Sequence, residues 1–103
     1  MSKKFEELQG DVLEWASDRD LLDYSGVLGQ LAKLLEESGE LARGVLKDDD
    51  DLIVDSLGDV MVVLTILSAQ LGHDLVDCYE VAYECIKDRK GVTLDGVFIK
   101  DSE

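Results

Sequence analysis

The sequence is poor in residues that carry several common kinds of chemistry. Its 103 residues include no proline, two cysteines and one histidine. With no low-complexity linker and no internal repeat, the length indicates a single domain over residues 1–103. The lone His73 leaves no Ser-His-Asp set to recognise. Cys78 and Cys85 lack the further ligands of a zinc site and the partners of a disulfide framework, so we expect two thiols in the core.

Basic residues are also scarce. The chain has 10 lysines and arginines against 24 acids, a formal net charge of −14 at pH 7. Such a surface repels DNA, RNA and anionic membranes, so we expect neither polymeric nucleic acid nor a membrane as a partner. An anionic small substrate would need metal cations to bridge it to the protein. The first residues are charged and lack the apolar stretch of a signal peptide, so we expect a cytoplasmic protein.

Helical periodicity, by contrast, runs through most of the chain. Apolar residues recur at helical spacing over residues 2–17, 27–46, 50–71 and 75–89, which predicts an all-α fold. Ser2 is the expected N-cap of the first helix, and Trp15 is expected in the core. The apolar face of the fourth helix is predicted to hold Val76, Tyr79, Tyr83 and Ile86.

The third expected helix is the most apolar part of the sequence. Residues 60–71 are apolar nearly all round, which is typical of a helix buried on most sides and too short to span a bilayer. One small domain can hardly cover such a helix, so we expect a four-helix bundle completed by oligomerisation, as a dimer or tetramer. After Gly91, the Asp95-Gly96 turn signal indicates either a small hairpin or an extended tail lying on a neighbour.

Paired acids stand beside apolar residues on two successive helices. Glu37 and Glu40 are three residues apart, and Asp55 and Asp59 are four apart, so each pair shares a helix face. Helices joined by a short loop usually pack antiparallel, which would bring the two pairs together. Converging carboxylates repel one another unless a cation lies between them. The spacing therefore points to a Mg²⁺ site that holds a phosphate, with a solvated acidic helix face as the alternative.

These segments also resemble a known family. EESGELARGVLK, DSLGDVMVVL, AYECIKDRKG and GVFIK, in this order, are similar to the MazG-like nucleoside triphosphate pyrophosphohydrolases of the all-α NTP pyrophosphatase superfamily. The small single-domain members of phages and bacteria are the most similar. The resemblance implies cleavage of a nucleoside triphosphate between its α and β phosphates, with Mg²⁺ or Mn²⁺ as cofactor. It also implies a role in clearing unwanted (d)NTPs.

The resemblance implies roles for individual acids. The family pattern is Glu-x-x-Glu on one helix and Glu-x-x-Asp on the next, which together hold Mg²⁺. The expected metal ligands are Glu37, Glu40, Asp55 and Asp59. Asp55 is included because Ser56 stands where the pattern has its second-helix glutamate. Glu36 and Glu37 are the expected catalytic carboxylates, acting as general base toward a metal-bound water or orienting it.

Substrate contacts are expected from a second set of residues, which comprises Lys33, Glu84, Lys87, Arg89 and Lys90. Lys33, one turn before Glu36 and Glu37, would meet a phosphate or relieve the local negative charge. The basic cluster of residues 87–90 would contact phosphates, or would simply place cations at a helix C-terminus. Relatives often have Asn at the position of Glu84. With Ser56, this departure keeps an alternative function open: a weakened or inactive oligomer that binds nucleotides or a protein partner.

Overall fold

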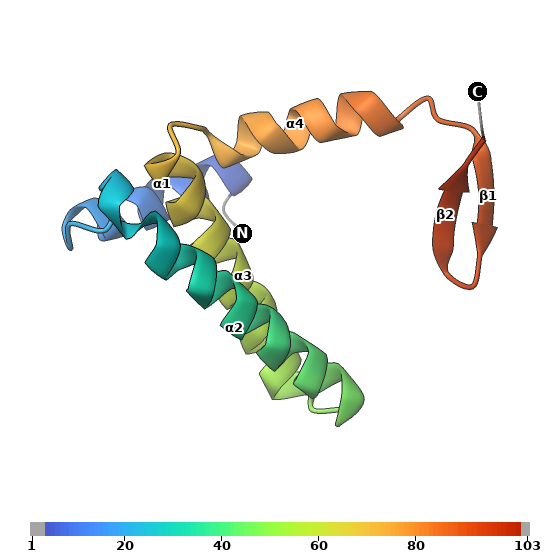
Figure 1. Ribbon diagram of the computed structural model, residues 1–103, viewed down its shortest axis with the longest axis horizontal. Coiled ribbons are helices and arrows are strands. Elements are labelled where there is room, and N and C mark those ends of the chain that lie inside the picture. Colours follow the sequence, from blue (N-terminus) through green and yellow to red (C-terminus); the bar gives the residue numbers. More distant parts are fainter. Residues whose placement is uncertain (1–3, 102–103) are drawn as a thin grey trace.

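The computed structural model describes residues 4–101. Its elements are α1 (Phe5–Ser17), the short 3-10 turn η1 (Tyr24–Gly26), α2 (Val27–Leu46), α3 (Asp50–Gln70), α4 (Leu75–Ile86), β1 (Gly91–Leu94) and β2 (Val97–Lys100). Figure 1 shows α2 and α3 side by side, α1 near the end of α3 far from the α2–α3 loop, and α4 leading away to the hairpin. The predicted all-α class is confirmed, and α2 has the predicted bounds. The expected N-cap Ser2 lies outside the described residues.

Close packing holds α2 against α3. Asp49 caps α3, and its carboxylate accepts a hydrogen bond of 3.1 Å from the amide of Leu52. Gly44 is buried on α2 beside Ile53 of α3. A β-carbon at Gly44 would lie 3.1 Å from Ile53 Cγ1 and 3.2 Å from the Ile53 nitrogen. The glycine therefore allows the two helices to approach closely near their connecting loop.

Replacing Gly44 with alanine should lower the free energy of unfolding. The added β-carbon forces α2 and α3 apart, and overpacking of this kind costs about 1–3 kcal/mol, of which the better helix propensity of alanine offsets up to about 1 kcal/mol. Gly29 on the same helix has open space around it, so Gly29→Ala is the matched control and should be neutral or stabilising. Urea unfolding measures both variants. Equal stabilisation of the two would contradict the close approach.

The first turn of α4 is tied to α1 by Gln9. The buried Gln9 side chain accepts a hydrogen bond from the amide of Val76 and donates one to Asp74, the N-cap residue of α4, both at 3.0 Å. Val76 is itself buried, but every residue from 77 to 90 is exposed. Beyond its first turn, α4 thus projects from the other helices, as Figure 1 shows.

The fourth helix is shorter than predicted. We expected it to reach residue 89, but it ends at Ile86. The amide of Arg89 donates to the carbonyl of Ile86 at 3.0 Å, which is a tighter turn than an α-helix makes. This turn leads the chain into the hairpin.

The C-terminal tail forms the hairpin rather than a single extended segment. Strands β1 and β2 are antiparallel, and Leu94 pairs with Val97 at the turn. The two turn residues, Asp95 and Gly96, both have positive φ, 51° and 79°. A two-residue hairpin turn of this handedness requires that conformation, which explains the Asp-Gly pair.

Several side chains expected in the core are exposed in the single chain. Trp15 is 47% exposed, and the guanidinium carbon of Arg19 lies 4.3 Å from its ring centroid. Cys78 and Cys85 are also exposed, which corrects their placement in the core. The same correction applies to Tyr79, Tyr83 and Ile86. For the residues of α4, the physical reason is that this helix has no packed neighbour along most of its length.

One side of α3 is exposed as well. Val63 and Ile66 are buried, but Val54, Leu57 and Met61 are 65%, 51% and 41% exposed. These three residues follow helical spacing and form a stripe, which is typical of a protein interface. By length and composition alone, α3 is the one described helix that could cross a membrane, a test that core helices of soluble proteins also pass.

Candidate metal and phosphate site

Two of the predicted metal ligands adjoin across α2 and α3. Glu37 on α2 is only 9% exposed, which is rare for a glutamate, and it interacts with Asp59 on α3. Burial raises the pKa of Glu37, and a side-chain hydrogen bond with Asp59 and the charge of Asp59 raise it further. The charge of Lys33 acts in the opposite direction. In the absence of a cation, the Glu37 carboxyl therefore holds its proton more tightly than an ordinary glutamate does.

The other predicted α2 acids are engaged in ion pairs of their own. Glu40 is half-buried and pairs with Arg43, one turn further along α2. The exposed Glu36 pairs with Lys33, at 3.6 Å between Nζ and Oε1. Arg43 was missed by the sequence analysis, although an acid and a base three residues apart on a helix would have indicated the pair.

On α3, Asp55 lies exposed one turn before Asp59. We call the five carboxylates of the two helices the acid face: Glu36, Glu37, Glu40, Asp55 and Asp59. Among residues 4–101, no three His, Cys, Asp or Glu side chains lie close enough to hold a metal ion together. The sequence predicted that four carboxylates converge. In the described part of the single chain, one pair lies together instead, Glu37 with Asp59.

Ser56 leaves the site with fewer acids than the family pattern has. It is 1% exposed and lies on the buried side of α3, one turn before Asp59. The family pattern has a glutamate at this position, whose carboxylate would stand beside the Glu37–Asp59 pair. Serine supplies a small hydroxyl there, so the site has one acid fewer.

The predicted substrate contacts lie in two separate parts of the chain. Lys33 lies one turn from Glu37 on α2, close enough to lower its pKa. Glu84 and Lys87 form an ion pair of 2.8 Å on α4, and Arg89 and Lys90 follow it. Figure 1 shows this end of α4 standing apart from α2 and α3. The structure therefore brings Lys33 to the acids within one chain and leaves the other four candidates at a distance.

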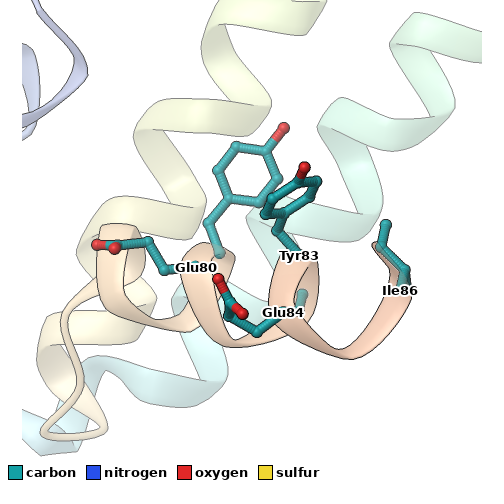
Figure 2. Close-up of a pocket in the computed structure, with 6 residues that line it drawn as sticks. Glu80, Tyr83, Glu84 and Ile86 are labelled. Atoms are coloured by element: carbon teal, nitrogen blue, oxygen red, sulfur yellow. The ribbon is translucent and has the colours of Figure 1, made fainter. Parts of the chain in front are cut away.

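A groove runs along the same part of α4. Its volume is about 420 Å³, and its lining consists of Tyr79, Glu80, Ala82, Tyr83, Glu84 and Ile86. In Figure 2, Tyr83 and Ile86 rise from the same side of the helix, and Glu80 and Glu84 lie along it. All of these residues belong to α4, so the groove is the open side of an unpartnered helix.

The Glu37–Asp59 pair suits a hard divalent cation. Mg²⁺ usually takes one or two protein carboxylates, and waters and substrate phosphates complete its coordination. A cation would replace the proton that burial and mutual repulsion otherwise favour at Glu37. Glu40 and Asp55, each within a turn of the pair, are the further acids available to such an ion.

Comparisons with known proteins bear on the same helices. Residues 27–95 match the family model of the MazG nucleotide pyrophosphohydrolase domain, a range that includes every predicted site residue. A protein of Haemophilus phage HP1 (strain HP1c1), described as an uncharacterized 18.2 kDa protein in the rep-hol intergenic region, is 45% identical over 71 residues. The match covers 69% of this chain and 44% of that protein, less than half of its length. No solved structure matches the chain.

Proposed function

Because this chain belongs to the MazG nucleotide pyrophosphohydrolase family, we propose that it hydrolyses nucleoside triphosphates to monophosphates and pyrophosphate, with Mg²⁺ as cofactor. The observation that carries the proposal is the buried carboxyl of Glu37 beside Asp59. Burying an ionised acid next to a second acid is unfavourable, and at neutral pH a bound cation compensates the charge without a proton. A cation held there would bind the phosphates of an anionic substrate to a chain whose net charge is −14.

The residues of the acid face would have different roles in catalysis. Glu37 and Asp59 hold the metal, with Glu40 and Asp55 as further ligands. When bound, Mg²⁺ polarises phosphate oxygens and lowers the pKa of a coordinated water. Glu36 is exposed beside Glu37, so its carboxylate can accept a proton from the attacking water. Lys33 neutralises part of the negative charge on that side of α2.

The composition supports a role in the nucleotide pool. A surface with 24 acids and 10 bases disfavours polymeric nucleic acid and anionic membranes as partners. Small nucleotides accompanied by a divalent cation do not face this repulsion. We therefore propose that the protein removes unwanted (d)NTPs in the cytoplasm.

Pyrophosphate release from a panel of canonical and modified (d)NTPs tests the proposal. We expect release with Mg²⁺ or Mn²⁺ and none with EDTA, and the ranking of substrates gives the base and sugar preferred. Asp59→Asn should lower the rate about 100-fold or more, because it removes one carboxylate of the pair. Asp51→Asn, an exposed position in the first turn of the same helix, is the matched control and should retain activity.

A second candidate function is nucleotide binding without hydrolysis. Two observations favour it: the buried Ser56 replaces a glutamate of the family pattern, and Glu84 is occupied by Lys87. In that case, folded protein would bind a nucleoside triphosphate in the presence of Mg²⁺ and release no pyrophosphate. Equilibrium dialysis alongside the release assay separates the two functions.

A further inference from the structure

Glu40 lies on α2 where its side chain can reach either of two partners. Successive residues of an α-helix are turned by about 100°, so a residue three positions away lies about one turn along the axis and about 60° around it. Glu37 lies at this spacing on the buried side, and Arg43 lies at the same spacing on the exposed side. The Glu40 side chain is itself 35% exposed, against 54% for that of Arg43. Its carboxylate therefore stands between the buried Glu37–Asp59 pair and solvent.

The structure shows which partner Glu40 takes. The Arg43 guanidinium donates a hydrogen bond to Oε2 of Glu40, and within residues 4–101 this is the only ion pair that Arg43 forms. A glutamate one turn before a base is favourable on a helix, whereas two like charges at this spacing repel. Glu37, in turn, interacts with Asp59. Glu40 is therefore held by Arg43, and it does not group closely with Glu37 and Asp59 as the ligands of one ion would.

A divalent cation at the Glu37–Asp59 pair would reverse the preference of Glu40. With the ion in place, Glu37 and Glu40 are attracted to a common positive charge instead of repelling one another. An ion pair between exposed side chains of one helix is weak, and salt weakens it further, so the ion can draw Glu40 away from Arg43. The contribution of the ion pair is then lost. The cation therefore binds less tightly than it would if Glu40 had no other partner.

We propose that Arg43 is a positioning residue that competes with the divalent cation for Glu40. Without the cation, Arg43 holds the Glu40 carboxylate at the exposed edge of the acid face. When the cation binds, the carboxylate turns toward Glu37 and Asp59, and the guanidinium is released to solvent. Arg43 thereby raises the Mg²⁺ concentration at which the site fills. The competition rests on the cation site of the proposed function, but it does not rest on hydrolysis.

Nitrogen NMR of the arginine side chains observes the release directly. The chain has three arginines, so the Nε–H signal of Arg43 is identified by its loss from the spectrum of Arg43→Lys. Addition of Mg²⁺ should shift this signal. Arg19, which stacks on Trp15, and Arg89 are internal references and should not change. An Arg43 signal that stays unchanged while the backbone amides of Glu37 and Asp59 report bound Mg²⁺ would overturn the competition.

Binding of Mn²⁺ measures the strength of the competition without any assay of activity, and the electron paramagnetic resonance of the free ion gives the Kd. Arg43→Gln should bind Mn²⁺ about two- to five-fold more tightly than the wild type, because a surface ion pair changes an equilibrium constant by about this factor. Lys47→Gln, at the exposed C-cap of α2, removes the same charge one turn further along. This control should change the Kd less than Arg43→Gln does. Equal changes in the two variants would overturn the competition.

The Glu40→Gln background separates competition for this carboxylate from the general effect of a positive charge. Glutamine leaves Arg43 without a carboxylate to hold, so the further change Arg43→Gln should no longer tighten the binding of Mn²⁺. The same two- to five-fold tightening with and without the Glu40 carboxylate would show that Arg43 acts on the ion by its charge alone. That result would overturn its role as a positioning residue.

Pyrophosphate release at varied Mg²⁺ concentration distinguishes failure of this inference from failure of the proposed function. Arg43→Gln should reach half of its maximal rate at about two- to five-fold less Mg²⁺ than the wild type needs. An active wild type whose Mg²⁺ dependence is the same as that of Arg43→Gln would overturn the competition and leave the proposed function standing. An inactive wild type would overturn the proposed function, and the binding of Mn²⁺ would then decide the competition alone. Failure of the wild type and of Arg43→Gln to bind Mn²⁺ would overturn both.

Discussion

Glu37→Gln should abolish hydrolysis and, in the absence of metal, make the chain more stable at neutral pH. In the folded chain the pKa of Glu37 is raised, first by burial and then by Asp59. The folded state therefore binds the proton of Glu37 more tightly than the unfolded state does. The stability that this proton supplies is complete below about pH 4.3, the ordinary pKa of a glutamate, and is lost as the pH rises through the raised value. Glutamine cannot ionise, so it escapes that loss.

Urea unfolding of the wild type and Glu37→Gln at pH 4 and pH 7, with EDTA present, measures this effect. The free energy of unfolding of the variant, relative to that of the wild type, should be higher at pH 7 than at pH 4. Activity should fall about 100-fold or more, because a metal ligand and candidate base is lost. Glu14→Gln, at an exposed position on α1, is the control and should change neither quantity. A Glu37→Gln variant with full turnover would refute the assignment of this carboxylate.

Ser56→Glu should make the stability of the chain depend on Mg²⁺. Ser56 is almost fully buried between the helices, one turn from Asp59. A third carboxylate there, without a cation, is a buried and uncompensated charge and should lower the free energy of unfolding by about 3 kcal/mol. The same carboxylate completes the acid pattern of the family, so Mg²⁺ should bind more tightly. At a Mg²⁺ concentration of a hundred times the Kd, binding of the ion would raise the free energy of unfolding by about 2.7 kcal/mol.

Thermal unfolding with EDTA and with Mg²⁺ compares Ser56→Glu with Ser56→Ala. The alanine variant loses at most a hydroxyl hydrogen bond, about 1 kcal/mol, and should respond to Mg²⁺ as the wild type does. Isothermal titration of Mg²⁺ into the three proteins gives the change in affinity directly. Equal stability of Ser56→Glu with and without Mg²⁺ would place this position outside the metal site.

The sequence predicted those parts of the fold that local signals determine. The apolar periodicity of residues 27–46 gave the bounds of α2, and the Asp95-Gly96 pair indicated the hairpin turn. The spacing of acids on successive helices indicated that Glu37 and Asp59 would adjoin. Each of these features depends on residues close in sequence, or on two helices joined by a loop of three residues.

Features that depend on distant packing were predicted less well. Trp15 was expected in the core but stacks with Arg19 at the surface, because the pattern of α1 does not say which of its residues α3 will cover. The apolar face of α4 is exposed beyond Val76 for a similar reason, since helical spacing predicts which residues share a face but not which element covers it. The pairing of Glu40 with Arg43 was missed because the acids were considered without the base one turn away.

Phosphorus NMR of one reaction tests the central claim most directly. Wild-type protein is incubated with a deoxynucleoside triphosphate and Mg²⁺, and the products are followed over time beside an identical sample with EDTA. The account predicts monophosphate and pyrophosphate in equal amounts with Mg²⁺ and unchanged triphosphate with EDTA. Diphosphate with inorganic phosphate, or unchanged triphosphate for every nucleotide tried with folded protein and Mg²⁺, would contradict it.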